Sequence, residues 1–132
     1  MIVDTSALIA VLQSEPEADT VLAALEEAES VAMSAATLLE ASIVADGSHD
    51  PVRSARFDTF VDALAAEIVP VDAAQAAIAR RAYHDYGRGS QHPARLNFGD
   101  CFAYALATVR REPLLFVGDD FVHTDIASAL EG

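Results

Sequence analysis

Short apolar segments with strand character alternate along this chain with longer helical segments, and this alternation limits the fold more than any other feature. Strands are expected at residues 1–4, 31–34, 67–72 and 114–118. Helices are expected at residues 7–12, 15–30, 35–45, 52–66, 73–86 and 96–111. Strands that alternate with helices form a parallel sheet covered on both faces. The sequence therefore predicts an α/β fold of three layers, α/β/α, around a central parallel sheet of four to five strands.

The size of the chain and its cysteine content limit the class of protein. Its 132 residues predict a single domain, residues 1–132, long enough to bury a core without cross-links. The only cysteine, Cys101, excludes an intramolecular disulfide and is expected to pack in the core. No apolar run approaches the ~18 residues that span a bilayer, and the N-terminus lacks the basic start of a signal peptide. We therefore expect no membrane association and a cytoplasmic location.

Acidic residues outnumber basic residues by 21 to 8, which gives a net charge of −13. This charge opposes broad, non-specific binding to nucleic acid or to anionic membranes. Every basic residue is an arginine, so mechanisms that need a lysine amine are excluded, among them Schiff-base chemistry and the lysine switch of receiver domains. The surplus of carboxylates is compatible with binding a hard cation.

Four positions combine a carboxylate with apolar surroundings, where an unpaired charge is costly. Asp4 ends the first strand, and Asp100 lies near the start of LNFGDCFAYALA. Glu40 lies inside the helix AATLLEASIVA, which is apolar nearly all round and is therefore expected to be buried. The fourth position is the pair Asp119 and Asp120, directly after the strand LLFVG. Each position also has a purely structural interpretation. Asp4 can be a helix cap and Glu40 a buried ion-pair partner. Asp100 can be an anion at a helix start, and Asp119 and Asp120 can be turn residues.

Together, these acids predict a ligand site at one edge of the sheet. Ligands of open parallel sheets bind at the carboxyl ends of the strands. If the first, second and fourth strands are neighbours, the acids face one cleft: Asp4, Glu40, Asp100 and Asp119. Carboxylates confined in this way repel one another unless a divalent cation lies between them, and all-oxygen ligands favour Mg²⁺ or Mn²⁺ over zinc.

Residues 80–95 form a basic stretch in this acidic chain. It contains Arg80, Arg81, Arg88 and Arg95, with Asp85 as its only acid. Such a stretch can be a solvated helix end followed by a loop. It can also contact the phosphates of a nucleic acid that enters the acidic cleft.

The segments IVDTSALIAVL, SAATLLEAS, LNFGDCFAYALA and LLFVGDDFVHTDI resemble PIN-domain ribonucleases, specifically the VapC toxins of bacterial toxin–antitoxin pairs. The resemblance covers nearly the whole chain and implies a PIN-like domain. It implies that the metal-binding and catalytic acids are Asp4, Glu40, Asp100 and Asp119, with Asp120 as the alternative at the fourth position. Ser6 matches the hydroxyl position that supports the metal site in this family.

The resemblance also implies an activity and partners. The expected activity is Mg²⁺-dependent endoribonuclease cleavage, with Mn²⁺ as a possible substitute. The expected assembly is a homodimer that a VapB-type antitoxin neutralises. Since the overall charge opposes RNA, we expect binding through local contacts of the arginines in 80–95 to a structured RNA, such as a tRNA or rRNA loop.

Two other functions are compatible with acids at the ends of parallel strands. The first is a non-catalytic, Mg²⁺-binding signalling domain of the phospho-receiver type, against which the lack of lysine and the position of Glu40 both count. The second is an RNA-binding domain without catalytic activity. The complete set of acids argues against it, because a pure scaffold has no use for their mutual repulsion.

Overall fold

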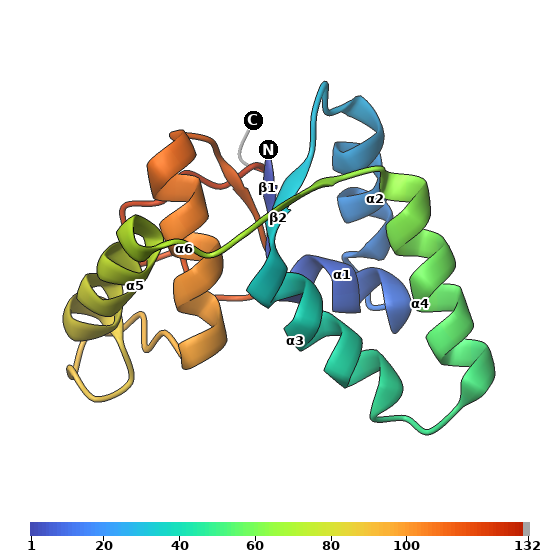
Figure 1. The fold of residues 1–132 in the computed structure, drawn as a ribbon, viewed down its shortest axis with the longest axis horizontal. Coiled ribbons are helices and arrows are strands. Elements are labelled where there is room, and N and C mark those ends of the chain that lie inside the picture. Colours follow the sequence, from blue (N-terminus) through green and yellow to red (C-terminus); the bar gives the residue numbers. More distant parts are fainter. Residues whose placement is uncertain (131–132) are drawn as a thin grey trace.

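Four short parallel strands form the centre of the protein in a computed structural model that describes residues 1–130 (Figure 1). The strands are β1 (Ile2–Val3), β2 (Ala32–Ser34), β3 (Glu67–Val69) and β4 (Leu114–Leu115). Their order in the sheet is β3-β2-β1-β4, and every neighbouring pair is parallel. The predicted parallel sheet is therefore confirmed with four strands. The first, second and fourth strands are neighbours, which is the arrangement that a shared cleft requires.

Within the described residues, six helices connect and cover the strands. They are α1 (Thr5–Leu12), α2 (Ala18–Glu27), α3 (Ala35–Asp46), α4 (Pro51–Leu64), α5 (Ala73–Tyr86) and α6 (Phe98–Arg110). Each lies within or close to a predicted helix. In Figure 1, α5 and α6 lie on one side of the strands and α1 to α4 lie on the other, which gives the expected three layers.

Successive side chains along the strands pack in two separate cores, one on each face of the sheet. Ile2 and Leu114 pack in the core that lies under α5 and α6. Val3 and Leu115, one residue further along each strand, pack in the core under α1 to α4. This alternation follows from the two-residue period of a strand. Cys101 lies in the first core, where burial and the nearby Asp100 raise the pKa of its thiol to about 11.

Helix starts cluster at the carboxyl edge of the sheet. α1 follows β1 directly, with Asp4 as its N-cap, and α3 follows β2 directly, with Ser34 as its N-cap. Both caps accept a hydrogen bond from the backbone N–H two residues ahead. Side chains in the first turns of these helices therefore lie beside the ends of the strands, where the predicted site is located.

The prediction that α3 is buried nearly all round is wrong. Only Thr37, Ala41 and Ala45 of this helix are buried, whereas Leu39 and Ile43 are 61% and 62% exposed. The reason is that α3 packs against α1, α4 and α6 with only part of its surface, and the apolar side chains of Leu39 and Ile43 face solvent. Within residues 1–130, no helix combines the length and apolar character needed to cross a membrane.

Candidate active site

A cleft of about 420 Å³ opens at the carboxyl edge of the sheet. The first turn of α1, the middle of α3, the start of α6 and the turn after β4 supply its walls. Its acidic lining residues include Asp4, Glu40, Asp100, Asp120 and Glu15. The fold thus brings together three of the four acids that the sequence selected, along with the alternative candidate for the fourth position.

Asp4 is held rigidly at the base of the cleft. Its Oδ2 accepts hydrogen bonds from the Ser6 backbone N–H at 3.0 Å and from the Ser6 hydroxyl at 2.7 Å. The Ser6 hydroxyl oxygen also accepts a hydrogen bond from the Val117 N–H at 3.0 Å, so it ties α1 to the segment after β4. Asp4 is only 3% exposed, and the pKa of its carboxyl group is raised to about 6, chiefly by this burial and to a smaller extent by the charge of Glu40. The Ser6 hydrogen bonds partly oppose that increase.

Asp100 is held by the cap of α6. Its Oδ2 accepts from the Asn97 N–H at 2.9 Å, and its own N–H donates to Asn97 Oδ1 at 2.8 Å, which forms a reciprocal capping box. The side chain is buried, with 7% exposure. The pKa of Asp100 is raised to about 7, chiefly by burial and also by the neighbouring carboxylates of Asp4 and Asp120, against the effect of the Asn97 hydrogen bond.

Glu40 reaches the cleft from α3. Its Oε1 accepts a hydrogen bond of 2.6 Å from the Thr5 hydroxyl. The side chain is only half-buried, so the expectation of a carboxylate enclosed by apolar neighbours is wrong. Leu39, directly before it in the sequence, is exposed instead, whereas Ala41, directly after it, is buried.

The structure brings Asp120 into the cleft and does not place Asp119 among the lining residues. Gly118, between β4 and this pair, has a φ of +99°, so the chain turns sharply where the two aspartates follow. Asp120, the alternative candidate for the fourth position, therefore lines the cleft, and Asp119 does not. The charge of Asp120 contributes to the raised pKa of Asp100, which places the two carboxylates near each other.

The donor set suits a hard divalent cation. It consists of carboxylate oxygens with hydroxyl support, and the raised pKa values of Asp4 and Asp100 indicate that a positive charge between them would be favourable. Within residues 1–130, no three His, Cys, Asp or Glu side chains converge closely enough, as they stand, to enclose a metal ion. The acids thus share one cleft without forming a closed coordination shell.

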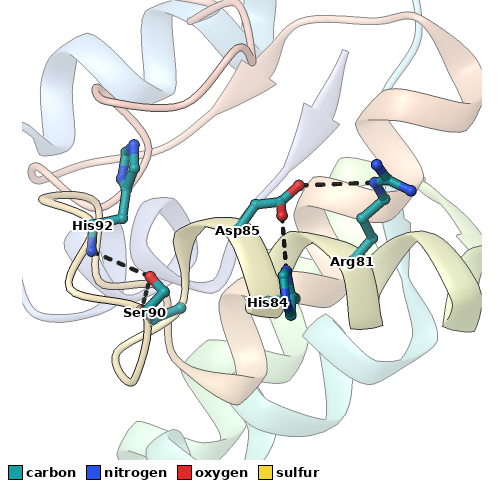
Figure 2. A network of polar contacts seen from close by, with 6 residues as sticks. Arg81, His84, Asp85, Ser90 and His92 are labelled. Atoms are coloured by element: carbon teal, nitrogen blue, oxygen red, sulfur yellow. Dashed lines mark hydrogen bonds and ion pairs between the residues drawn. The ribbon is translucent and has the colours of Figure 1, made fainter.

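The four arginines of residues 80–95 are exposed and lie outside the acidic cleft. Figure 2 shows that Asp85 is shared between Arg81, at 3.8 Å, and His84, at 3.0 Å. Arg81 is therefore partly neutralised by its own helix. Figure 2 also shows Ser90 accepting from the His92 N–H, one of the bonds that order the loop after α5.

The same loop leads directly to the cleft. Its ends are tied together by hydrogen bonds from the Arg88 N–H to the Leu96 carbonyl at 3.1 Å and from the Leu96 N–H to the Tyr86 carbonyl at 2.8 Å. Leu96 is followed by Asn97, which lines the cleft. Arg88 and Arg95 therefore lie on a loop closed at its base beside the start of α6.

Asn97 and Thr5 are two of the polar cleft residues that were not among the predicted site residues. Asn97 could have been found, because an Asn three residues before an acid at the start of an apolar helix is a capping-box pattern. Thr5 carries no such signal, since its contact with Glu40 joins residues 35 positions apart.

The PIN domain family model matches residues 1–127. The VapC ribonuclease Mb0625 of Mycobacterium bovis is 51% identical over 131 residues, which cover 99% of this chain and 98% of that protein. Ribonuclease VapC42 of Mycobacterium tuberculosis is 48% identical over 129 residues, 98% of each chain.

Two solved structures share the fold. One is Mycobacterium tuberculosis VapC20, described as a Sarcin-Ricin loop cleaving toxin, with a TM-score of 0.72, 15% identity, and coverage of 96% of this chain and 95% of that one. The other is a toxin-antitoxin complex from Klebsiella pneumoniae, with a TM-score of 0.68, 21% identity, and coverage of 94% and 92%. At these identities the two structures establish the fold alone.

Proposed function

Because this chain belongs to the PIN-domain family and is a toxin ribonuclease of the VapC type, we propose that its acidic cleft is a divalent-metal site for cutting structured RNA. The observation that carries the proposal is the meeting of Asp4, Glu40, Asp100 and Asp120 in one cleft at the sheet edge. Membership of this family sets aside the receiver-like signalling function.

The acidic residues of the cleft have different parts in binding the metal. Asp4 and Asp100 hold the principal ion, since both are buried and oriented by hydrogen bonds to one of their oxygens. Glu40 and Asp120 complete the donor set. When bound, Mg²⁺ or Mn²⁺ supplies an activated water and stabilises negative charge on the scissile phosphate. The half-buried Glu40 is kept in place by its hydrogen bond from the Thr5 hydroxyl.

RNA reaches the cleft along the basic loop. Arg88 and Arg95 supply phosphate contacts next to the start of α6, and Arg80 and Arg81 extend the contacts along α5. With few contacts available, selectivity comes from RNA shape, which favours a tRNA or rRNA loop. A Sarcin-Ricin loop cleaving toxin of the same fold supports this substrate class.

A protein partner covers the apolar surface beside the cleft. Leu39, Ile43 and Val44 of α3, with Phe98 of α6, line a groove of about 380 Å³ that shares Glu40 with the acidic cleft. These side chains are 42% to 78% exposed. We assign the surface to a VapB-type antitoxin that brings an arginine to the carboxylates, and we expect the toxin to act as a homodimer in the cytoplasm. A toxin-antitoxin complex among the structures of this fold supports such a partner.

Cleavage of total bacterial RNA by the purified chain, with mapping of the new RNA ends, tests this function. We expect cleavage at few sites with Mg²⁺ or Mn²⁺ and none with EDTA. Asp4→Asn and Asp100→Asn should each reduce the cleavage rate by about 100-fold or more, since each removes a charged oxygen ligand. The matched control is Asp58→Asn, which removes an exposed carboxylate of α4. Full activity of either cleft variant would refute the assignment.

A further inference from the structure

Gly99 occupies an unusual position at the start of α6. With Asn97 as the N-cap, it lies in the first turn between Phe98 and Asp100. Its backbone is not in the left-handed region, so conformational freedom does not explain a glycine here. Glycine weakens a helix relative to alanine, and its presence calls for another reason.

Space provides that reason. A Cβ atom built on Gly99 would come within 3.0 Å of three atoms of Glu40: Oε1, Oε2 and Cδ. Real Cβ atoms essentially never make contacts this short. The Glu40 carboxylate therefore lies directly against the backbone of α6, in the place that a side chain at position 99 would fill.

On its other side, the same carboxylate is held by α1. The Thr5 hydroxyl donates a 2.6 Å hydrogen bond to Glu40 Oε1, and the same hydroxyl lies 3.5 Å from the Thr37 carbonyl oxygen of α3. Glu40 is thus confined between Thr5 and Gly99. Its partners Asp4 and Asp100 are each one residue away from these two contacts in the sequence.

We propose that Gly99 is a positioning residue of the metal site, whose missing side chain lets the Glu40 carboxylate lie at the start of α6 beside Asp100. This inference rests on the proposed function of the cleft. A methyl group at position 99 displaces the carboxylate toward solvent, away from Asp100. The displaced group is the end of a flexible side chain, so the fold itself is not disturbed.

The inference separates folding from metal binding, and Gly99→Ala tests both. We expect the Tm of the metal-free variant to match or exceed that of the wild type, because alanine restricts the unfolded chain and favours the helix. We expect its affinity for Mn²⁺, measured by calorimetry, to fall by about tenfold or more. Gly89→Ala is the matched control, because a Cβ there meets nothing within 4 Å.

A double-mutant cycle shows whether the effect passes through Glu40. In a Glu40→Ala background, Gly99→Ala should cause no further loss of Mn²⁺ affinity, because nothing remains to be displaced. In a Glu40→Asp background the loss should be smaller than in the wild type, because the shorter side chain withdraws the carboxylate from the new methyl group.

Three results would overturn the inference. They are wild-type Mn²⁺ affinity in Gly99→Ala, an equal loss in the Glu40→Ala background, or failure of the Glu40→Ala, Gly99→Ala double variant to fold. If the wild-type chain itself bound no Mn²⁺, the metal site would fail together with the inference. Wild-type binding that Gly99→Ala leaves unchanged refutes the role of Gly99 alone.

Discussion

Two buried carboxylates, Asp4 and Asp100, carry the electrostatic cost of the site. Both have a pKa above the ordinary value of an aspartate, chiefly because burial disfavours their charged forms. Between the unfolded pKa of 3.8 and the folded pKa, the folded state binds more protons than the unfolded state. Their contribution to the free energy of unfolding therefore falls as pH rises from about 4 to about 7.

This sign predicts how Asp4→Asn changes the stability of the metal-free protein. Asparagine keeps the N-cap acceptor of α1 and removes the charge. The rise in the pKa of Asp4 to about 6 corresponds to about 3 kcal/mol. We expect the variant to be more stable than the wild type at pH 8, with the difference shrinking toward pH 4. Urea unfolding with EDTA measures the free energy of unfolding of both proteins at each pH. A difference between them that does not change with pH would contradict this prediction.

The sequence identified some of the cleft carboxylates more clearly than others. Asp4 and Asp100 could be identified because each follows or opens an apolar segment, which makes a charge conspicuous. The sequence favoured Asp119 over Asp120, whereas only Asp120 lines the cleft, because the position of each aspartate depends on the direction of the chain after Gly118. A backbone turn of this kind leaves no mark in the pattern of polar and apolar residues.

Among the elements, α6 matters most for the site, because its first turn contains both Asp100 and Gly99. We predict that Asn97→Ala destabilises the protein by about 1 kcal/mol through loss of the cap. It should also weaken Mn²⁺ binding, because the Asp100 N–H loses its acceptor, Asn97 Oδ1, and the first turn of α6 that carries the Asp100 carboxylate is then held less firmly. Asn97→Ser, which retains a capping side chain, should restore most of both properties. Thermal unfolding and calorimetry measure them, and unchanged metal affinity in Asn97→Ala would show that the cap does not position Asp100.

α3 shows where prediction of the elements failed. Its run of apolar residues correctly predicted a helix but wrongly predicted that it is buried. Apolar residues that face a partner protein and apolar residues that face the core are chemically alike, so the sequence cannot separate them. The exposed positions Leu39 and Ile43 belong to the surface that we assign to the antitoxin.

At the scale of the whole molecule, the alternation of strands and helices was sufficient to predict the parallel sheet and the location of the site at its carboxyl edge. That the first, second and fourth strands are neighbours could be stated only as a condition, since the order of strands in a sheet depends on contacts between residues distant in sequence. The molecule that results carries a net charge of −13, yet it presents its exposed arginines of residues 80–95 on one helix and the adjoining loop. We therefore predict that RNA binds against the overall field through these local contacts.

This distribution of charge predicts a modest salt dependence. Each phosphate contact to a single strand contributes a slope of about −0.7 to the dependence of log affinity on log salt. Arg88→Ala combined with Arg95→Ala should weaken binding of a stem-loop RNA and reduce the slope by about 1 to 1.5. Arg53→Ala with Arg56→Ala, on α4, removes the same charge elsewhere and should leave the slope nearly unchanged. Equal slopes for the two double variants would place the RNA path elsewhere.

Anomalous diffraction from crystals grown with Mn²⁺ shows whether one cleft gathers four carboxylates around a divalent cation. We predict a Mn²⁺ peak in the cleft, bounded by carboxylate oxygens of Asp4 and Asp100, with Glu40 and Asp120 bound to it directly or through water and Asp119 outside. The absence of a peak at saturating Mn²⁺, or a peak away from Asp4 and Asp100, would contradict the account.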